Sequence, residues 1–175
     1  DIGTGSGDIA MTVSRWARRR GLDVTVYPLD ISARNLRVAR DVVGGAAGVH
    51  LLHADALALP FAAGVYDYAI SSLMLHHLSQ EQLIALIRET YRKARRGIIF
   101  TDLTRGRLAL AGFDLITAPL FARHRFTKHD GHVSIQRAYM PDELRAMARE
   151  AGIEVATVHA HFPFRMTLVA DKADV

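Results

Sequence analysis

The 175-residue sequence contains no cysteine. This absence excludes disulfide bonds, thiolate zinc sites and a cysteine nucleophile. It is typical of proteins from a reducing compartment, and we therefore expect a cytoplasmic protein. No apolar run approaches the roughly 20 residues that a membrane-spanning helix requires, so the sequence predicts no integral membrane segment.

The sequence also begins without methionine, and only Asp1 and Ile2 precede the first glycine of a glycine-rich motif. A buried parallel strand normally has about five or six residues. Hydrophobic residues make up 50% of the sequence, which is normal for a globular protein. We expect residues 1–175 to form a single domain that lacks an N-terminal segment and most of its first strand.

The sequence is basic, with an isoelectric point of about 9.8, and nearly all of the positive charge is arginine. Two basic clusters end predicted helices: Arg15, Arg18, Arg19 and Arg20, and then Arg92, Lys93, Arg95 and Arg96. Cations at helix C-termini complement the helix dipole. Solvated helix ends are therefore favoured over a polyanion site, and nucleic acid is an unfavoured partner.

Helical and strand periodicities alternate along the first hundred residues. The expected helices are 8–20, 33–43, 79–94 and 141–152, and the expected strands are 24–30, 49–53, 66–72, 97–102, 153–158 and 162–170. Alternation of this kind favours right-handed βαβ units with helices on both faces of a parallel sheet. The sequence predicts a Rossmann-like, doubly wound α/β fold with a mostly parallel seven-stranded sheet and an antiparallel last strand.

The alternation breaks at residues 105–139, which we interpret as a helical and loop insertion over the strand ends where a substrate would bind. Residues 108–121 form an apolar helical stretch, which is either plain core or the wall of a lipophilic pocket. A polar, histidine-rich stretch follows at 122–139. Inserted loops over the strand ends commonly carry specificity.

Three signals converge at the carboxyl ends of the first predicted strands. Gly3, Gly5 and Gly7 form a strand-to-helix turn that lets a ligand approach the backbone. Asp30 ends the next strand, where a carboxylate can accept both hydroxyls of a ribose. Asp55 follows the strand after that, near the expected place of an adenine. Ligands of doubly wound sheets bind at this edge.

The glycine spacing discriminates between two nucleotide classes. A dinucleotide fingerprint would place glycine at the sixth position counted from Gly3, where this sequence has Asp8. Asp1 and Asp8 also make the turn acidic, which repels phosphate and attracts a sulfonium or ammonium group. A cationic nucleoside ligand is therefore favoured over a pyrophosphate.

These motifs resemble those of the class I S-adenosylmethionine-dependent methyltransferases, of the type that acts in ubiquinone and menaquinone biosynthesis. Residues 1–7 (DIGTGSG) are similar to motif I, 29–32 (LDIS) to the ribose motif, and 53–61 (HADALALPF) to the adenine-side motif. Residues 66–78 resemble the fourth motif. The resemblance covers residues 1–102 in the family's order.

The resemblance implies S-adenosyl-L-methionine as the cofactor and assigns residues to it. Asp1 would hold the ammonium group, Asp30 the ribose, and Asp55 the adenine amino group. Ile31 would pack on the adenine, and Ala56 would offer a backbone N–H. The full expected cofactor set is Asp1, Gly3, Gly5, Gly7, Asp30, Ile31, Asp55, Ala56 and Ser71. Asp55 has the alternative of capping its own turn.

Histidines supply the candidates for a catalytic base. His129 is the first choice and His76 the second, although His76 has the alternative of fixing its loop through a hydrogen bond. His132 is a weaker candidate. The histidine spacing fits no familiar zinc pattern, so no metal is expected. Methyl transfer from a sulfonium needs mainly alignment, and a base assists where the acceptor carries a proton.

The expected reaction is methylation of a small, hydrophobic, ring-bearing acceptor, with O-methylation favoured over C-methylation. Residues 71–74 (SSLM) replace the Asn/Asp-Pro-Pro-aromatic run of enzymes that methylate nucleic-acid bases. Two alternatives stay open. One is an NAD-linked oxidoreductase, and the other is a non-catalytic module that binds a cofactor or nucleic acid on the same fold.

Overall fold

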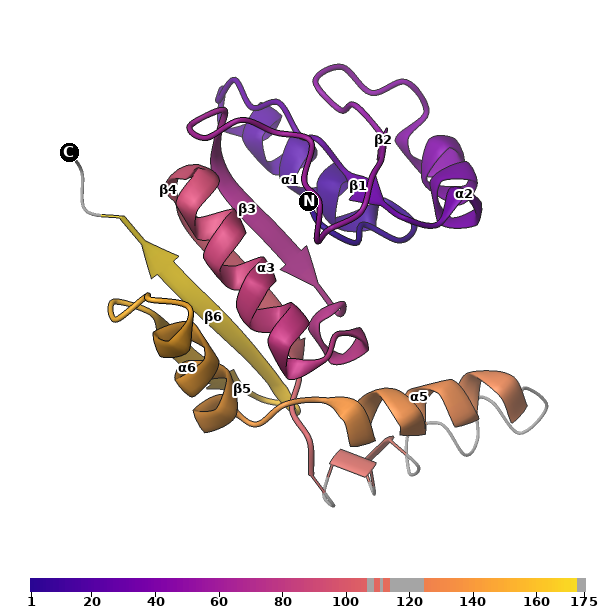
Figure 1. The fold of residues 1–175 in the computed structure, drawn as a ribbon. Coiled ribbons are helices and arrows are strands. Elements are labelled where there is room, and N and C mark those ends of the chain that lie inside the picture. The colour runs from indigo at the N-terminus through magenta and orange to yellow at the C-terminus, as the bar shows by residue number, and fades with distance from the viewer. Residues whose placement is uncertain (107–108, 111, 114–124, 173–175) are drawn as a thin grey trace.

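The computed structural model describes residues 1–106, 109–110, 112–113 and 125–172 (Figure 1). The helices are α1 (Asp8–Arg19), α2 (Ala33–Val43), the 3₁₀ turn η1 (Leu75–His77), α3 (Gln80–Lys93), α5 (Arg125–Arg137) and α6 (Pro141–Glu150). The strands are β1 (Leu29–Asp30), β2 (Leu52–His53), β3 (Tyr66–Ser72), β4 (Ala94–Leu103), β5 (Thr157–His161) and β6 (Arg165–Asp171).

The strands form one twisted sheet whose halves meet at Ile2. Four strands follow the order β3-β4-β6-β5, and β1 pairs with β2. Ile2 bridges Leu29 on one side and Ser71 on the other, both in parallel. β3 and β4 are parallel, whereas β6 is antiparallel to both β4 and β5. The structure confirms the doubly wound fold and the antiparallel last strand, with Ile2 in the position of a first strand.

The expected strand 24–30 is shorter in the structure because Pro28 interrupts its ladder. The N–H of Val26 donates to Gly48 O at 2.7 Å, and the N–H of His50 donates to Val26 O at 2.9 Å. The next donor in this alternation would be residue 28, but proline has no N–H. Pairing resumes where Leu52 N–H donates to Pro28 O at 2.9 Å. The strand is thereby reduced to a bridge at Val26 and the two residues of β1.

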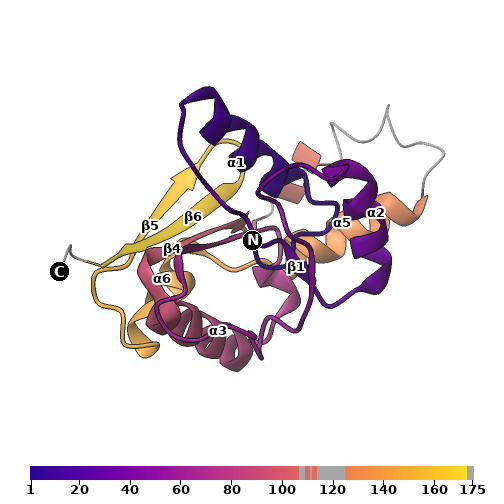
Figure 2. The ribbon, with the colours of Figure 1, turned by 90° about the horizontal axis from the view of Figure 1, so that it is seen from above.

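Helices cover both faces of the sheet. α3 and α6 lie on one face and α1 lies on the other (Figures 1 and 2). Fully buried side chains fill the space between the sheet and the layer formed by α3 and α6: Leu83, Ile87, Ile98, Phe100, Leu144, Met166 and Leu168. Side chains cap two of the helices: Ser32 accepts from Asn35 N–H at the start of α2, and Ser79 forms a capping box with Gln82 at the start of α3.

The second half differs from the sequence expectation in two places. The histidine-rich stretch contains α5, which lies beyond the carboxyl ends of β3 and β4 (Figure 1). The strand expected at 153–158 begins later, at Thr157, because Ile153 follows a turn and is buried in the core at 3% exposure. The apolar stretch 108–121 falls largely outside the described residues.

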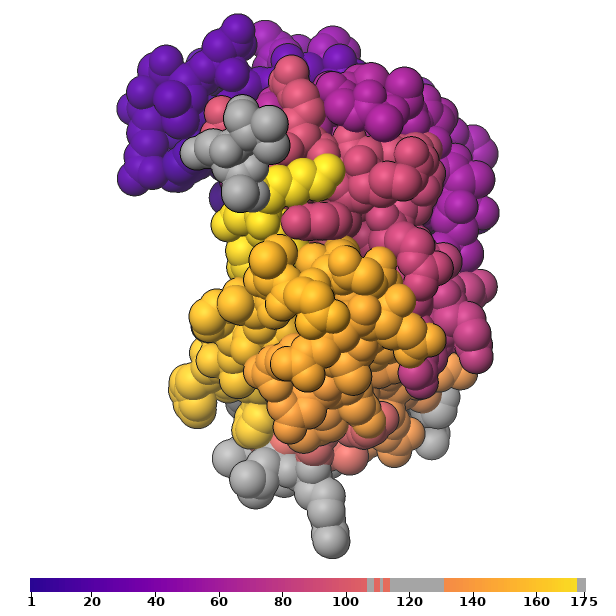
Figure 3. All heavy atoms as spheres, turned by 60° about the vertical axis from the view of Figure 1, so that its left-hand side comes forward, coloured from indigo at the N-terminus to yellow at the C-terminus, as the bar shows by residue number. Residues whose placement is uncertain are grey.

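A groove of about 830 Å³ lies at the amino-terminal half of β3, between that strand and residues 23–27. Trp16 and Phe61 line it. Asp1 and Ile2, at the start of the glycine turn, also line it. Seen from the α6 side in Figure 3, α1 projects from the body of the molecule. No helix in the described part of the chain has the length and apolarity needed to cross a membrane.

Candidate functional site

The glycine turn leaves open space at one of its three glycines. A Cβ on Gly3 would collide with the Met74 side chain, and a Cβ on Gly7 would lie 3.3 Å from Ala39 Cβ. A Cβ on Gly5 would meet nothing within 4 Å. Gly5 has φ of 56°, a conformation that favours glycine. Gly3 and Gly7 are therefore needed for packing, whereas Gly5 borders free space at the helix start.

Asp30 connects this turn to the end of β1. Its side chain is 6% exposed and accepts from Gly5 N–H at 2.9 Å, Ser32 N–H at 2.8 Å and Asn35 Nδ2 at 3.2 Å. The structure thus brings together the turn and the strand-end carboxylate that the sequence singled out. A carboxylate offers about four lone-pair positions, so one remains for a ligand hydroxyl.

Asp1 stands at the other side of the turn. Its Oδ2 atom accepts from the Thr4 hydroxyl at 2.6 Å. Thr4 is also held by its backbone, whose N–H donates to Leu29 O at 2.9 Å. Asp8 accepts from the Ser6 hydroxyl at the first turn of α1. Two carboxylates therefore flank the turn, and the field that they create favours a cationic ligand.

The predicted adenine-side residues lie at the adjacent strand ends. Ile31 is 66% exposed, and its carbonyl lies 2.8 Å from His53 Nε2. Asp55 follows β2, and its Oδ1 accepts from Leu57 N–H at 2.8 Å. This carboxylate therefore caps its own turn in the present structure. Ala56, inside that turn, is half-buried.

Ser71 is used by the scaffold. Its hydroxyl donates to Ile2 O at 2.9 Å, and the residue is 3% exposed. The bond fastens the end of β3 to the bridge that joins the two halves of the sheet.

A buried pair lies at the carboxyl ends of β3 and β4. Asp102 is 1% exposed and His76 is 6% exposed. The Nδ1 atom of His76 lies 2.8 Å from Asp102 Oδ1, and the His76 backbone N–H donates to Asp102 Oδ2 at 2.9 Å. Sequence reasoning named His76 but missed Asp102. The same signal that marked Asp30, a carboxylate at the end of a buried parallel strand, would have found it.

The other two candidate histidines, His129 and His132, lie on α5. His129 falls within this helix, but its side chain lies outside the described residues. The ring of His132 stacks edge-on against Phe113 at a centroid distance of 5.7 Å. Among the residues whose side chains the structure places, no group of histidines and carboxylates has metal-binding geometry.

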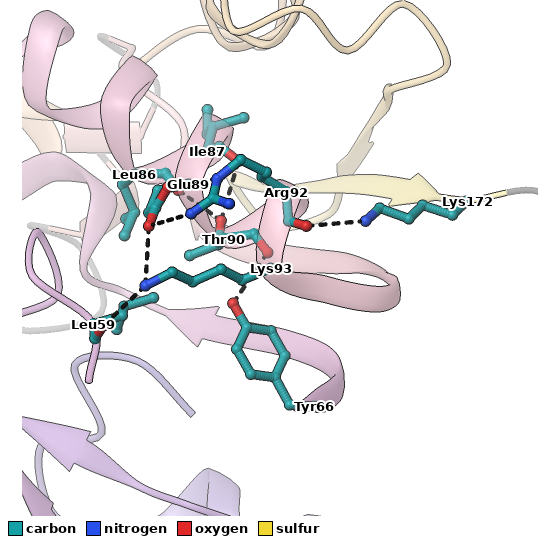
Figure 4. Close-up of polar contacts among 9 residues, drawn as sticks. All are labelled: Leu59, Tyr66, Leu86, Ile87, Glu89, Thr90, Arg92, Lys93 and Lys172. Atoms are coloured by element: carbon teal, nitrogen blue, oxygen red, sulfur yellow. Dashed lines mark hydrogen bonds and ion pairs between the residues drawn. The ribbon is translucent and has the colours of Figure 1, made fainter. Parts of the chain in front are cut away.

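A lysine at the end of α3 anchors the loop that follows Asp55 (Figure 4). Lys93 is 9% exposed, and its Nζ donates to Leu59 O at 3.0 Å and lies 2.9 Å from Glu89 Oε1. Arg92 binds the same carboxylate at 3.0 Å. These two cations lower the pKa of Glu89 to about 2, with the hydrogen bond from Arg92 contributing most.

Replacing Lys93 with methionine is expected to lower the free energy of unfolding at neutral pH by about 1–2 kcal/mol, because the Leu59 carbonyl loses a charged donor. Arg92→Met is the matched control, since the Arg92 side chain is 59% exposed and binds the same Glu89 carboxylate. The free energy of unfolding of Arg92→Met at neutral pH should fall by less than that of Lys93→Met, because water replaces the partner of an exposed cation. Urea unfolding measures both, and equal losses would contradict the anchoring role.

The ion pair between Glu89 and Arg92 predicts that the free energy of unfolding decreases at acid pH. The Glu89 pKa is lowered on folding, so its contribution is complete above the ordinary value of 4.5 and disappears as the pH falls towards about 2. Arg92→Met should weaken this loss of stability between those two pH values. An unchanged acid profile in Arg92→Met would count against the ion pair as its source.

Comparisons with known proteins place this arrangement in a family. Residues 1–97 match the family described as "Methyltransferase domain". The chain is 29% identical to a demethylmenaquinone methyltransferase of Roseiflexus castenholzii, over 87% of this chain and 66% of that protein. It is 30% identical to O-methyltransferase cnsE of Penicillium expansum, over 90% of this chain and 52% of that protein. The chain therefore spans between half and two thirds of these relatives.

A solved structure has the same fold. The SAM-dependent methyltransferase from Aquifex aeolicus aligns over 99% of this chain and 80% of its own, with a TM-score of 0.73 and 19% identity. The family match favours the methyltransferase interpretation over the dinucleotide oxidoreductase. The chain belongs to the class I S-adenosylmethionine-dependent methyltransferases.

Proposed function

We propose that the protein transfers the methyl group of S-adenosylmethionine to a small, hydrophobic, ring-bearing acceptor, with oxygen favoured over carbon as the methylated atom. The observation that carries the cofactor assignment is the open space at Gly5 beside the buried carboxylate of Asp30. The acceptor class is supported by the relatives, whose names include demethylmenaquinone and O-methyl transfer.

The residues present fit the cofactor. The free space at Gly5 would admit its amino-acid end, and the acidic flank of Asp1 suits an ammonium group. The remaining acceptor position of Asp30 suits a ribose hydroxyl. The exposed Ile31 would cover one face of the adenine, with Asp55 and Ala56 at its edge.

The bound cofactor supplies a methyl group on a sulfonium, which is an activated leaving group. The protein's contribution is to align the acceptor and to exclude water. Where the acceptor carries a proton, a nearby base assists. His129 and His76 stay the predicted candidates for that base, and His76 is held at the strand ends by Asp102.

The test combines binding and turnover. Calorimetric titration of S-adenosylhomocysteine and NAD into the protein should show binding of the first alone. A panel of phenols and quinols with S-adenosylmethionine should then give methylated product. Binding of S-adenosylhomocysteine without turnover on either panel would overturn the acceptor class and leave the cofactor assignment standing.

Gly5→Ala is expected to abolish cofactor binding at a small cost in stability. Its methyl group would enter the free space, and its positive φ costs about 1 kcal/mol in a residue with a side chain. Gly21→Ala is the matched control, because Gly21 has φ of 65° and also has no atom within 4 Å of the added Cβ. Both variants should unfold alike, and only Gly5→Ala should lose calorimetric binding. Loss of binding in both would refute this assignment of Gly5.

A further inference from the structure

η1 contacts both β4 and α5. α5 lies beyond the carboxyl ends of β3 and β4 (Figure 1). The Asp102 carboxylate on β4 binds the backbone and ring of His76 in η1. Tyr139, just after α5, donates its hydroxyl to Leu78 O at 2.8 Å. The backbone of η1 is therefore held from two sides.

The region around η1 adjoins the glycine turn. Met74, the residue before η1, packs over Gly3 so closely that a Cβ there would collide with it. The N–H of His77 donates to Met74 O at 3.0 Å. His77 therefore belongs to the same rigid turn that contacts the cofactor loop.

The two neighbouring histidines have different surroundings. The His76 ring is buried, and its Nδ1 atom is used by Asp102. The His77 side chain is exposed, and its ring centroid lies 4.1 Å from that of His76. An acceptor that approaches the strand ends from solvent meets the His77 ring, whereas His76 lies beneath it.

Arg137 is the last residue of α5, the helix that contacts η1. Its side chain is exposed and its charge acts on His77. The pKa of His77 is held below its ordinary value by partial burial first and by His76 next; Asp102 opposes them, and Arg137 adds the smallest lowering. His77 is consequently neutral at physiological pH, the form in which imidazole accepts a proton.

We propose that His77, in place of His129 and His76, is the base that takes the proton of an acidic acceptor hydroxyl, that Arg137 stabilises the resulting oxyanion, and that Asp102 and His76 position the His77 turn. The acceptor O–H bond breaks with its proton going to the imidazole, and the oxygen electron pair forms the new C–O bond as the methyl–sulfur bond breaks. The inference rests on the proposed methyltransferase function.

The pairing of a neutral imidazole with a cation selects the substrate class. A phenol has a pKa near 10, within reach of a base assisted by a neighbouring guanidinium. An aliphatic alcohol is far weaker as an acid and gains little from the same groups. The site is therefore matched to phenols or enols.

The first test uses the protein without substrate. NMR titration of the histidine rings, with His77 assigned by its absence in His77→Asn, should give a His77 midpoint that moves to higher pH in Arg137→Gln. Arg149→Gln, in the last turn of α6, is the matched control and should leave it unchanged. An identical His77 midpoint in the wild type and Arg137→Gln would overturn the pairing.

The second test uses 4-nitrophenol, whose absorbance reports its ionised form, in the presence of S-adenosylhomocysteine. The wild type should bind the phenol with an increased ionised fraction, and Arg137→Gln should reduce that fraction. With S-adenosylmethionine, His77→Asn should lower kcat/KM for a phenol roughly 100-fold and remove the acid limb of its pH profile.

The outcomes separate this inference from the function on which it rests. Phenol turnover that keeps its acid limb in His77→Asn would overturn the role of His77 and leave the acceptor class intact. Bound nitrophenol with an unchanged ionised fraction would overturn the role of Arg137. Binding of S-adenosylhomocysteine without any binding of the phenol would overturn both this inference and the proposed acceptor class.

Discussion

Replacing Asp30 with alanine is expected to remove the thermal stabilisation that S-adenosylhomocysteine gives the protein. A buried carboxylate that accepts a ribose hydroxyl contributes up to about 3 kcal/mol, the upper end of the range for a charged acceptor, so its loss should weaken binding roughly 100-fold. At a ligand concentration near 100 times the wild-type Kd, the stabilisation should fall from about 2.7 kcal/mol to a few tenths. A thermal shift assay measures the change directly.

The variant must be separated from a general loss of structure. Asp30 also accepts from Gly5 N–H and Ser32 N–H, and we therefore expect the unliganded protein to lose about 1–2 kcal/mol. Asp41→Ala, on the exposed face of α2, is the control that should change neither quantity. A ligand-induced shift of wild-type size in Asp30→Ala would overturn the assignment of Asp30 to the ribose.

Asp30 was predictable because two local signals coincide there. A short apolar run predicts a buried strand, and a carboxylate at its carboxyl end lies about 20 residues after a glycine turn. Parallel strands bring their carboxyl ends to one edge of the sheet, so sequence order alone places the two groups together. The structure shows the result as the bond from Gly5 N–H to Asp30.

Other features depend on contacts that no local pattern contains. The stretch around α5 is polar on most sides, and Ile135 at 5% exposure and Ala138 at 0% become buried only against the rest of the protein. Tertiary packing supplies most of the stability of such a helix. In the same way, the pairing of His76 with Asp102 spans 26 residues, and periodicity gives no sign of it.

Pro28 shows how one residue sets an element's length. The run from Val24 to Asp30 has strand composition, and its register with the neighbouring strand is kept on both sides of the proline. The missing N–H leaves a gap in that ladder. The strand was therefore predictable. Its division into a bridge and β1 was not, because it depends on residue 28 occupying a donor position in the ladder to the neighbouring strand.

Replacing Asp102 with alanine is expected to cause the largest loss of stability among the variants considered, about 3 kcal/mol. The carboxylate is almost completely buried and accepts from His76 N–H, His76 Nδ1 and Leu103 N–H, the last at 2.7 Å. Its removal leaves these donors without a partner and away from water, and each buried unsatisfied donor costs about 1–3 kcal/mol. The melting temperature should fall by roughly 6–12 °C.

Asp67→Ala provides the comparison that isolates burial. Asp67 lies on β3 and contacts Arg95 at 3.0 Å and Arg96 at 3.8 Å, but its side chain is 52% exposed. Its loss should cost less than about 1 kcal/mol, because water replaces both partners. Chemical denaturation of the two variants therefore compares one carboxylate deletion in two environments. Equal losses would mean that water reaches His76 once the carboxylate is gone, and that Asp102 does not fix η1 at the end of β4.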